Sequence, residues 1–187
     1  SKTVKKKLES KIKNLLYFFK KFQNGTERAS YGLRLIKKKY SGVLIVSCDN
    51  PYVDNFGIKA TLDCYKKIRR NNQYCAATIH CKTHKKKLDK NIAKLVLSKT
   101  NDVLYISRNE IPSKSLNNFY FTHHGPVCIK FNHLKNYQSI QSTPLQILED
   151  NEWLNFIERG FKIKSVLVKK INREINTKKD LKYYRNR

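Results

Sequence analysis

Several features that are common in proteins are scarce or missing in this sequence of 187 residues. It has no methionine, one tryptophan, six glycines and four prolines, and it contains no internal repeat or Gly/Pro-rich linker. One domain of ordinary size is therefore expected. No apolar run approaches the roughly 20 residues that span a bilayer, which excludes a membrane bundle. Because methionine is absent, we expect that the initiator was removed or that the chain was processed or truncated.

The five cysteines are odd in number and include no Cys-x-x-Cys pair, which argues against a disulfide framework and favours a reducing compartment. Cys75, His80, Cys81 and His84 are residue types that bind zinc. They fall, however, on a segment typical of a strand, whose neighbouring side chains point to opposite faces. No second ligand pair follows at a usual spacing. We therefore expect an ordinary strand and loop without a metal site.

Acidic residues are scarce compared with basic ones: 14 Asp and Glu stand against 40 Lys and Arg, which gives a formal net charge of +26. The excess lies in residues 1–39, 82–99 and 159–187, and the rest of the chain is neutral. Basic segments repel one another unless a polyanion neutralises them, and nucleic acid is the partner that this pattern favours. Solvated surface charge with a genome bias towards lysine is one alternative, and an acidic membrane surface is another.

If RNA is the partner, the side chains that contact its phosphates should come from these three segments. Tyr183 and Tyr184 offer rings for stacking on bases, although rings on a terminal helix more often pack against protein. The expected RNA contacts are Lys5, Lys6, Lys7, Lys11, Lys37, Lys38, Lys39, Lys85, Lys86, Lys87, Lys169, Lys170, Arg185 and Arg187.

Hydrophobic periodicity predicts the order of helices and strands. Residues 2–22 form an amphipathic helix, with an apolar stripe from Val4 to Phe22 that is too dispersed for a secretory signal. This helix should pack on the domain, dock or face RNA, or lie on an anionic membrane. Further helices are expected at residues 29–39, 54–71, 144–159 and 177–187, with Asp54 and Thr143 as caps of the second and third. Strands are expected at residues 42–48, 73–80, 93–98, 102–106, 125–131 and 162–168.

Helices that alternate with short apolar strands indicate an α/β fold with a mainly parallel sheet and helices on both faces. We divide the chain into a basic amphipathic helix, residues 1–22, and one domain, residues 23–187, which ends in a basic helix. Neither part carries an RRM, KH or zinc-ribbon signature.

From residue 23 onward, seven short segments follow one another in the order of a known family. Val103-Leu-Tyr-Ile-Ser-Arg-Asn-Glu-Ile-Pro112 is the most specific and is similar to A-L-Y-F-S-R-x-x-I-P. Gln23-Asn-Gly-Thr-Glu-Arg28 resembles S-G-T-[DE]-R, and Leu44-Ile-Val-Ser-Cys-Asp-Asn-Pro51 stands where that family has V-N-V-Q-G-D-E-P. Thr122-His-His-Gly-Pro-Val127 is similar to R-H-x-G-I-Y.

The remaining segments lie in the last quarter of the chain. Ser142-Thr-Pro-Leu-Gln resembles P-S-x-L-E and is followed by Glu149 and Glu152 at matching spacing. Gly160-Phe-Lys-Ile-Lys164 comes next, and Ile175-Asn-Thr-Lys-Lys-Asp-Leu181 is similar to V-D-T-x-x-D-L. By these motifs the chain resembles the CMP-Kdo synthetases, the 3-deoxy-manno-octulosonate cytidylyltransferases. The resemblance implies a truncated, Rossmann-like nucleotidyltransferase sheet.

Such enzymes, as the resemblance implies, join CTP and Kdo to give CMP-Kdo and pyrophosphate with magnesium. Two aspartates hold the magnesium against the phosphates, and a basic glycine-rich loop takes the leaving pyrophosphate. Asp49 and Asn176 stand at the two metal positions of this chain. The residues that match the nucleotide and sugar pocket are Gly25, Thr26, Arg28, Arg108, His123 and Glu152.

The chain departs from the family pattern around this site. The opening loop, G-A-R-x-x-S-x-R-x-P-x-K, is absent with most of the first nucleotide-binding half, and we expect the N-terminal helix or another chain to cover the place of its strand. Asn176 replaces the second metal aspartate, and a neutral amide binds magnesium weakly without supplying a compensating charge. Other positions also differ from the family pattern. A glycine is replaced by Cys48, an acid by Asn50 and a tyrosine by Val127. The two sugar-facing glutamines are replaced by Ser47 and Trp153.

Two hypotheses from different classes follow from these departures. The first is a catalytically inactive, cytidylyltransferase-like protein that needs no cofactor. It would act as a basic structural, RNA-binding component of a ribonucleoprotein, with a mitochondrial ribosome as host and rRNA and neighbouring proteins as partners. The alternative is a CMP-Kdo synthetase of the bacterial cytoplasm that uses Mg²⁺ and whose N-terminal half is missing or on another chain.

Overall fold

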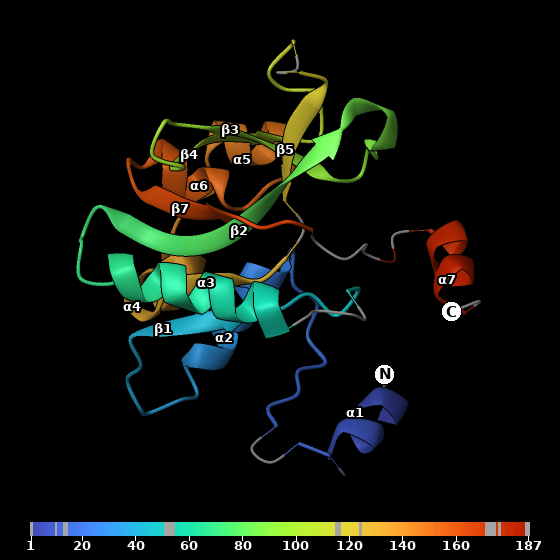
Figure 1. The fold of residues 1–187 in the computed structure, drawn as a ribbon. Coiled ribbons are helices and arrows are strands. Elements are labelled where there is room, and N and C mark those ends of the chain that lie inside the picture. The colour runs from blue at the N-terminus through green and yellow to red at the C-terminus, as the bar shows by residue number, and fades with distance from the viewer. Residues whose placement is uncertain are drawn as a thin grey trace.

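The computed structural model describes residues 2–9, 11–12, 15–50, 55–114, 117–123, 125–170, 175 and 177–185. These residues form a seven-stranded sheet with helices on both faces (Figure 1). The strands are β1 (Gly42–Ile45), β2 (Tyr74–His84), β3 (Ala93–Leu97), β4 (Val103–Ser107), β5 (Phe119–His123), β6 (Val127–Lys130) and β7 (Lys162–Leu167). The helices are α1 (Lys2–Glu9), α2 (Gly25–Leu33), α3 (Asn55–Ile68), α4 (Phe131–Asn136), α5 (Pro144–Glu149), α6 (Leu154–Glu158) and α7 (Lys178–Arg185), with short 3₁₀ turns η1 (Lys85–Lys87) and η2 (Tyr137–Ser139).

The long strand β2 belongs to two parts of the sheet. Its first half pairs with β6 and with β7, and its second half pairs with β5. β5 and β6 therefore run as consecutive segments antiparallel to β2. The strand order along this path is β1-β6-β2-β5-β3-β4, and β7 pairs with β2 outside it.

The α/β class with helices on both faces is confirmed, but the expectation of a mainly parallel sheet is wrong. Among the described strands, β2 and β7 alone pair in parallel, and every other pairing is antiparallel. β3, β4 and β5 follow one another without a helix between them. Parallel neighbours need a long crossover, so strands joined in this way pair antiparallel. β5, which the sequence analysis did not anticipate, is the strand that joins β3 to β2.

Different helices cover the two faces of the sheet. α3 packs Tyr65 and Ile68 on one face, where they meet Cys128 of β6. Val127 and Ile129 point to the other face because successive side chains on a strand alternate. There they join the largest apolar cluster, with buried residues of α2, α4 and α6. The longest described helix, α3, has 14 residues, and none of the described helices is long and apolar enough to cross a membrane.

The amphipathic stripe of residues 2–22 does not form one helix. α1 ends at Glu9, and the described residues from 15 to 22 are not helical. Phe18 and Phe22 instead contact the ring of Tyr31 in α2, with centroid distances of 5.2 and 5.4 Å. A Cβ at Gly32 would lie only 3.3 Å from the Phe18 ring. Aromatic packing on α2 replaces the expected helix, and β1 forms one edge of the sheet. That another chain covers the place of the family's opening strand stays a prediction.

The helix expected over residues 144–159 is two helices. α5 ends at Glu149 because Asp150 adopts the left-handed region, with φ of 46°. Thr143 occupies the cap position of α5, but its side chain makes no capping hydrogen bond. The interruption leaves Glu152 in the turn before α6.

The other elements overlap their predicted positions, although β1 ends three residues earlier and β2 four residues later than expected. α2 begins four residues earlier than expected, where the Asn24 side chain accepts a hydrogen bond from the Glu27 N–H at 2.8 Å, and it ends at Leu33. α4 was not expected, and the cap predicted at Asp54 lies outside the described residues. α7 begins after Thr177, whose N–H and hydroxyl both donate to Asp180, and Figure 1 shows α1 and α7 standing apart from the sheet. The division of the chain at residue 22 stays a prediction.

Candidate active site

A cavity of about 230 Å³ opens where β5 ends and β6 begins. Pro126 has no N–H to donate to a strand ladder, and pairing with β2 stops at Thr122 and resumes at Val127. Side chains tie this break to β2 instead: the Thr78 hydroxyl donates to the Pro126 carbonyl at 2.9 Å, and His123 Nδ1 lies 2.8 Å from the Ile79 carbonyl. The lining residues are Gly25, Thr26, Ile45, Ser47, Asn91, Ala93, Arg108, His123, Gly125, Val127, Glu152 and Trp153.

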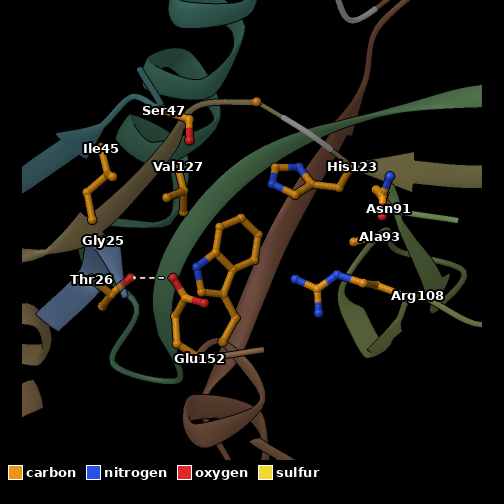
Figure 2. Close-up of a pocket in the computed structure, with 12 residues that line it drawn as sticks. Gly25, Thr26, Ile45, Ser47, Asn91, Ala93, Arg108, His123, Val127 and Glu152 are labelled. Atoms are coloured by element: carbon orange, nitrogen blue, oxygen red, sulfur yellow. Dashed lines mark hydrogen bonds between the residues drawn. The ribbon is translucent and has the colours of Figure 1, made fainter. Parts of the chain in front are cut away.

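Five of the six residues predicted for the nucleotide and sugar pocket line this cavity. Gly25 and Thr26 come from α2, Arg108 follows β4, His123 ends β5, and Glu152 lies between α5 and α6. Figure 2 shows Arg108 and His123 on one side of the space and a hydrogen bond between Thr26 and Glu152 on the other.

Arg28, the sixth predicted residue, lies elsewhere. Its guanidinium is 5.7 Å from the centre of the Phe22 ring. Residues two apart on a helix point about 200° away from each other, so Arg28 faces away from the side of α2 that carries Thr26.

Two polar contacts orient the side chains inside the cavity. The buried Thr26 hydroxyl donates to Glu152 Oε1 at 3.1 Å. A carbonyl oxygen only accepts, so His123 Nδ1 carries the proton that it shares with Ile79, and Nε2 is the acceptor of the neutral ring. The ring of Trp153 lies 4.5 Å from that of His123, which gives the cavity an aromatic wall.

The most specific sequence stretch, around Tyr105 and Arg108, is bound to the end of α5. The Tyr105 and Ser107 hydroxyls donate to the two carboxylate oxygens of Glu149 at 3.0 and 2.6 Å. Arg108 Nη1 donates to the carbonyls of Glu149 and Asp150 at 3.2 and 3.1 Å. Burial, and then the bond to Glu149, raise the pKa of Tyr105. Two motifs that are distant in sequence thus form one unit that holds Arg108.

Lys94 also holds Arg108, and the sequence analysis missed this role. Its side chain is 1% exposed, and Nζ donates to the carbonyls of Arg108 and Asp89 at 2.7 and 2.9 Å. Burial lowers the pKa of Lys94. Its place within the apolar strand Ala93–Leu97, where a charged residue is rarely buried without partners, was the available signal.

Asp49, the predicted metal aspartate, lies just beyond Ser47 of the cavity lining. Its carbonyl accepts a hydrogen bond from the Ile175 N–H at 2.8 Å, so the structure brings together the two segments that carry the predicted metal positions. Asn176 itself lies outside the described residues. The Asp49 Oδ1 atom is buried and has no hydrogen-bond partner in the described part of the chain.

The histidines and cysteines around β2 have separate partners. His80 Nδ1 lies 2.7 Å from Ser165 Oγ, and Cys81 Sγ lies 3.3 Å from Thr122 Oγ1. Burial lowers the pKa of His80 to about 4 and raises that of Cys75 to about 12. Within the residues that the structure describes, no three His, Cys, Asp or Glu side chains are placed to hold a metal ion.

The predicted RNA contacts are spread over several parts of the protein. Lys86, Lys87, Lys169 and Lys170 line one hollow beyond the end of β2. Lys85 instead pairs with Glu110 at 3.2 Å. Lys5, which pairs with Glu9, and Lys6 lie in α1, and Lys11 follows it. Lys37, Lys38 and Lys39 lie between α2 and β1, and Arg185 lies in α7. Arg187 and the side chain of Lys7 lie outside the described residues. Tyr183 and Tyr184 contact each other, with ring centroids 5.3 Å apart.

Comparison with curated proteins identifies relatives of one kind, although no protein-family profile matches the chain. The "3-deoxy-manno-octulosonate cytidylyltransferase" of Protochlamydia amoebophila is 29% identical over 168 residues, which cover 84% of this chain and 63% of the relative. The protein of that name from Elusimicrobium minutum is 30% identical, with coverages of 88% and 70%. A mitochondrial one from Arabidopsis thaliana is 30% identical, with coverages of 78% and 51%. The chain thus spans 51–70% of the length of these relatives.

Solved structures share the fold. A "CMP:2-keto-3-deoxy-manno-octonic acid synthetase complexed with CTP" superposes with a TM-score of 0.73 at 19% identity, over 88% of this chain and 68% of that one. A 4-diphosphocytidyl-2C-methyl-D-erythritol synthase from Anaerococcus prevotii gives 0.61 at 16% identity, over 100% and 77%. These likenesses establish a nucleotidyltransferase-like fold. Together with the sequence match over most of the Elusimicrobium protein, they show that this chain belongs to the 3-deoxy-manno-octulosonate cytidylyltransferase (CMP-Kdo synthetase) family.

Proposed function

We propose that this chain serves the cytidylyl transfer for which its relatives are named, in which an acid sugar of the Kdo type is joined to the CMP part of CTP. The observation that carries the proposal is the convergence of Thr26, Arg108, His123 and Glu152 on one cavity. These residues come from four separate segments of the sequence. The family supports the same reaction, and because the chain spans only part of its relatives, the activity, substrates and partners of the whole protein are part of the proposal.

The chemistry needs fixed charge and a base near the reacting phosphate. A sugar hydroxyl oxygen attacks the α-phosphorus of CTP, the bond from that phosphorus to the bridging oxygen breaks, and pyrophosphate leaves. Arg108 Nη1 is held by two carbonyls and pairs with the Asp150 carboxylate at 3.6 Å, and the rest of the guanidinium offers positive charge to a substrate carboxylate or phosphate. Glu152 already accepts a hydrogen bond from a hydroxyl, and with the neutral form of His123 it supplies a base for the proton of the attacking hydroxyl.

Magnesium is the metal that the family implies, and Asp49 fits it. The buried Asp49 Oδ1 atom without a hydrogen-bond partner among the described residues is an acceptor that a cation would satisfy. Mg²⁺ is commonly held by one or two carboxylates together with substrate phosphates, so one aspartate suffices as protein ligand. We propose that Asp49 holds Mg²⁺, which when bound neutralises charge on the phosphates. The Asn176 amide would take the second position.

The ribonucleoprotein hypothesis gains no support from these findings. The relatives are named for cytidylyl transfer, and the fold is that of nucleotidyltransferases. A ribosomal host and an inactive site were both inferred from charge and from departures in the motifs, whereas the cavity assembles most of the predicted pocket residues. The alternative hypothesis, a CMP-Kdo synthetase, is therefore the function that we propose.

The test is the release of pyrophosphate from CTP in the presence of Kdo and Mg²⁺. The assay has two arms, the chain alone and the chain mixed with a fragment that carries the opening loop of the Protochlamydia relative. We expect release in at least one arm, and loss of it in Arg108→Ala but not in Lys37→Ala, which removes one positive charge from the loop between α2 and β1. Absence of release in both arms would contradict the proposal.

A further inference from the structure

A second, larger hollow of about 1110 Å³ lies beyond the end of β2, and we call it the basic hollow. Its wall is formed where residues 81–92 turn from β2 towards β3, by the start of β5, and by the residues that follow β7. Figure 1 shows this turn in green beyond the arrowhead of β2. The lysines that line the basic hollow are Lys82, Lys86, Lys87, Lys90, Lys169 and Lys170.

Lysines outnumber acidic residues in the described lining of the basic hollow by six to one. All six lysines are exposed, and within the described residues none of them forms an ion pair. Lys85, beside them in sequence, is paired with Glu110, and Asp89 is the acidic residue of the lining. The parallel pairing of β2 with β7 brings two basic segments together that are about 80 residues apart in sequence. A concave surface lined with one sign of charge concentrates a field that attracts an extended anion.

Aromatic rings stand among these lysines. Phe119 is 41% exposed, and its ring packs edge-to-face on His84, with centroids 5.2 Å apart. His84 is oriented in turn by the N–H of Lys86, which donates to His84 Nδ1 at 3.2 Å. Both rings line the basic hollow. A groove that combines lysines with an exposed ring is the arrangement that binds single-stranded nucleic acid, since the lysines follow the phosphates and the ring stacks on a base.

We propose that the basic hollow binds single-stranded nucleic acid, with its lysines on consecutive phosphates and Phe119 against a base. The proposal goes beyond cytidylyl transfer and does not depend on it, because among the described residues Asn91 alone lines both the basic hollow and the active-site cavity. A bilayer is a poorer fit, since its flat surface contacts protruding side chains rather than a concave wall. Of the fourteen RNA contacts predicted from sequence, four lie here, and Lys82 and Lys90 are additions.

The experiment measures binding of the full chain to a labelled 12-nucleotide single strand of mixed sequence, by fluorescence anisotropy at several KCl concentrations. The hollow variant is Lys86→Gln/Lys87→Gln/Lys169→Gln, and the control is Lys37→Gln/Lys38→Gln/Lys39→Gln, which removes the same charge on the loop between α2 and β1. Each phosphate contact on a single strand contributes about −0.7 to the log–log salt slope. The hollow variant should flatten the slope by about two and bind roughly tenfold more weakly, whereas the control should match the wild type.

A third variant separates stacking from charge. Phe119→Ala should weaken binding roughly tenfold and leave the salt slope unchanged, because stacking does not release counterions. Equal losses in the two triple-lysine variants would mean that binding follows net charge alone and would overturn the proposal. Displacement of the strand by equimolar CTP, or tighter binding to phosphatidylserine vesicles than to the strand, would also overturn it.

The outcomes of the two proposals can be told apart. Arg108→Ala should lose cytidylyl transfer and keep nucleic-acid binding, while the hollow variant should show the reverse. A chain that binds the strand but never releases pyrophosphate would leave the basic hollow proposal standing and contradict the proposed function.

Discussion

The active-site cavity and the basic hollow meet at Asn91, yet they hold their polar groups in opposite ways. In the cavity, Arg108 is bound to two carbonyls and Thr26 to Glu152, so the side chains are fixed before any ligand arrives. In the basic hollow the lysines are exposed and, among the described residues, without ion pairs. Fixed groups suit a reaction that needs precise placement, whereas flexible lysines suit a phosphate backbone whose path varies. The same sheet thus supports a rigid site and an adaptable one.

The largest effect that should separate the two regions comes from Asp49→Ala. Cytidylyl transfer should fall on the order of 10²–10³-fold, because the proposed charge stabilisation at the phosphates is lost. Thermal stability should not fall, since the buried Asp49 Oδ1 has no hydrogen bond to lose within the described structure. Pyrophosphate release and a thermal melt measure the two quantities, and strand binding serves as control. A large drop in Tm would show instead that Asp49 is structural.

Acid should weaken both regions together, because both depend on β2 and His80 lies in its middle. Burial lowers the pKa of His80 from 6.5 to about 4, so between these values the unfolded chain binds a proton that the folded chain does not. The free energy of unfolding therefore rises with pH through this window, and acidification from pH 7 to 4 costs about 3 kcal/mol at this group. Urea titrations at several pH values measure it.

The control for this pH dependence is a second histidine of the same strand. His80→Gln should flatten the fall in stability between pH 6.5 and 4, while His84→Gln, at the partly exposed end of β2, should keep it. An unchanged pH profile in His80→Gln would assign the acid sensitivity to other groups.

Lys94→Met should lower the stability of the protein and loosen Arg108 in the active-site cavity, while it leaves the basic hollow little changed. The change removes the donor of two part-buried hydrogen bonds, to the backbone carbonyls of Asp89 and Arg108, and their loss costs about 2 kcal/mol of unfolding free energy. Because Arg108 is then held less firmly, kcat for cytidylyl transfer should fall by a larger factor than the affinity for single-stranded nucleic acid. A Lys94→Arg variant, which keeps donors at this place, should recover part of kcat, and equal losses in both variants would argue for a purely structural role.

The smallest expected effect is that of Asn24→Ala. Asn24 caps α2 and Glu27 returns a bond to the Gln23 N–H, so the variant should lose about 1 kcal/mol. Because α2 carries Thr26, the apparent KM for substrate should rise while the salt slope of strand binding stays the same. A change in that slope would mean that the two regions are coupled more closely than their shared residue indicates.

Sequence motifs and hydrophobic periods predicted the features that depend on residues close together in the sequence. Five of the six residues that the family motifs predicted for the pocket, Gly25, Thr26, Arg108, His123 and Glu152, line one cavity. The hydrophobic periods of α3 and β7 predicted those elements nearly at their observed bounds. The helix over 2–22 failed because the rings of its second half pack on α2, a contact that periodicity does not contain.

Features that depend on the pairing of strands distant in sequence could not be predicted from sequence motifs or hydrophobic periods. β5 is a run of aromatic residues without clear alternation, and it becomes a strand because β2 and β3 pair with its two edges. The basic hollow exists because the pairing of β2 with β7 brings Lys169 near Lys86. The sequence shows the lysines of both segments, but their place on one wall depends on a strand pairing between residues about 80 positions apart.

β2 pairs along both of its edges with strands that come much later in the sequence, so its pairing must wait during synthesis. β2 ends at His84, but its partners begin at residues 119, 127 and 162, so its edges stay unpaired until most of the chain has been made. Loops must close over these long separations before the contacts repay their entropy, which slows folding. The active-site cavity forms where β2 pairs with β5 and β6, and the basic hollow also needs the later pairing of β2 with β7, so both surfaces take shape only after most of the chain has been synthesised.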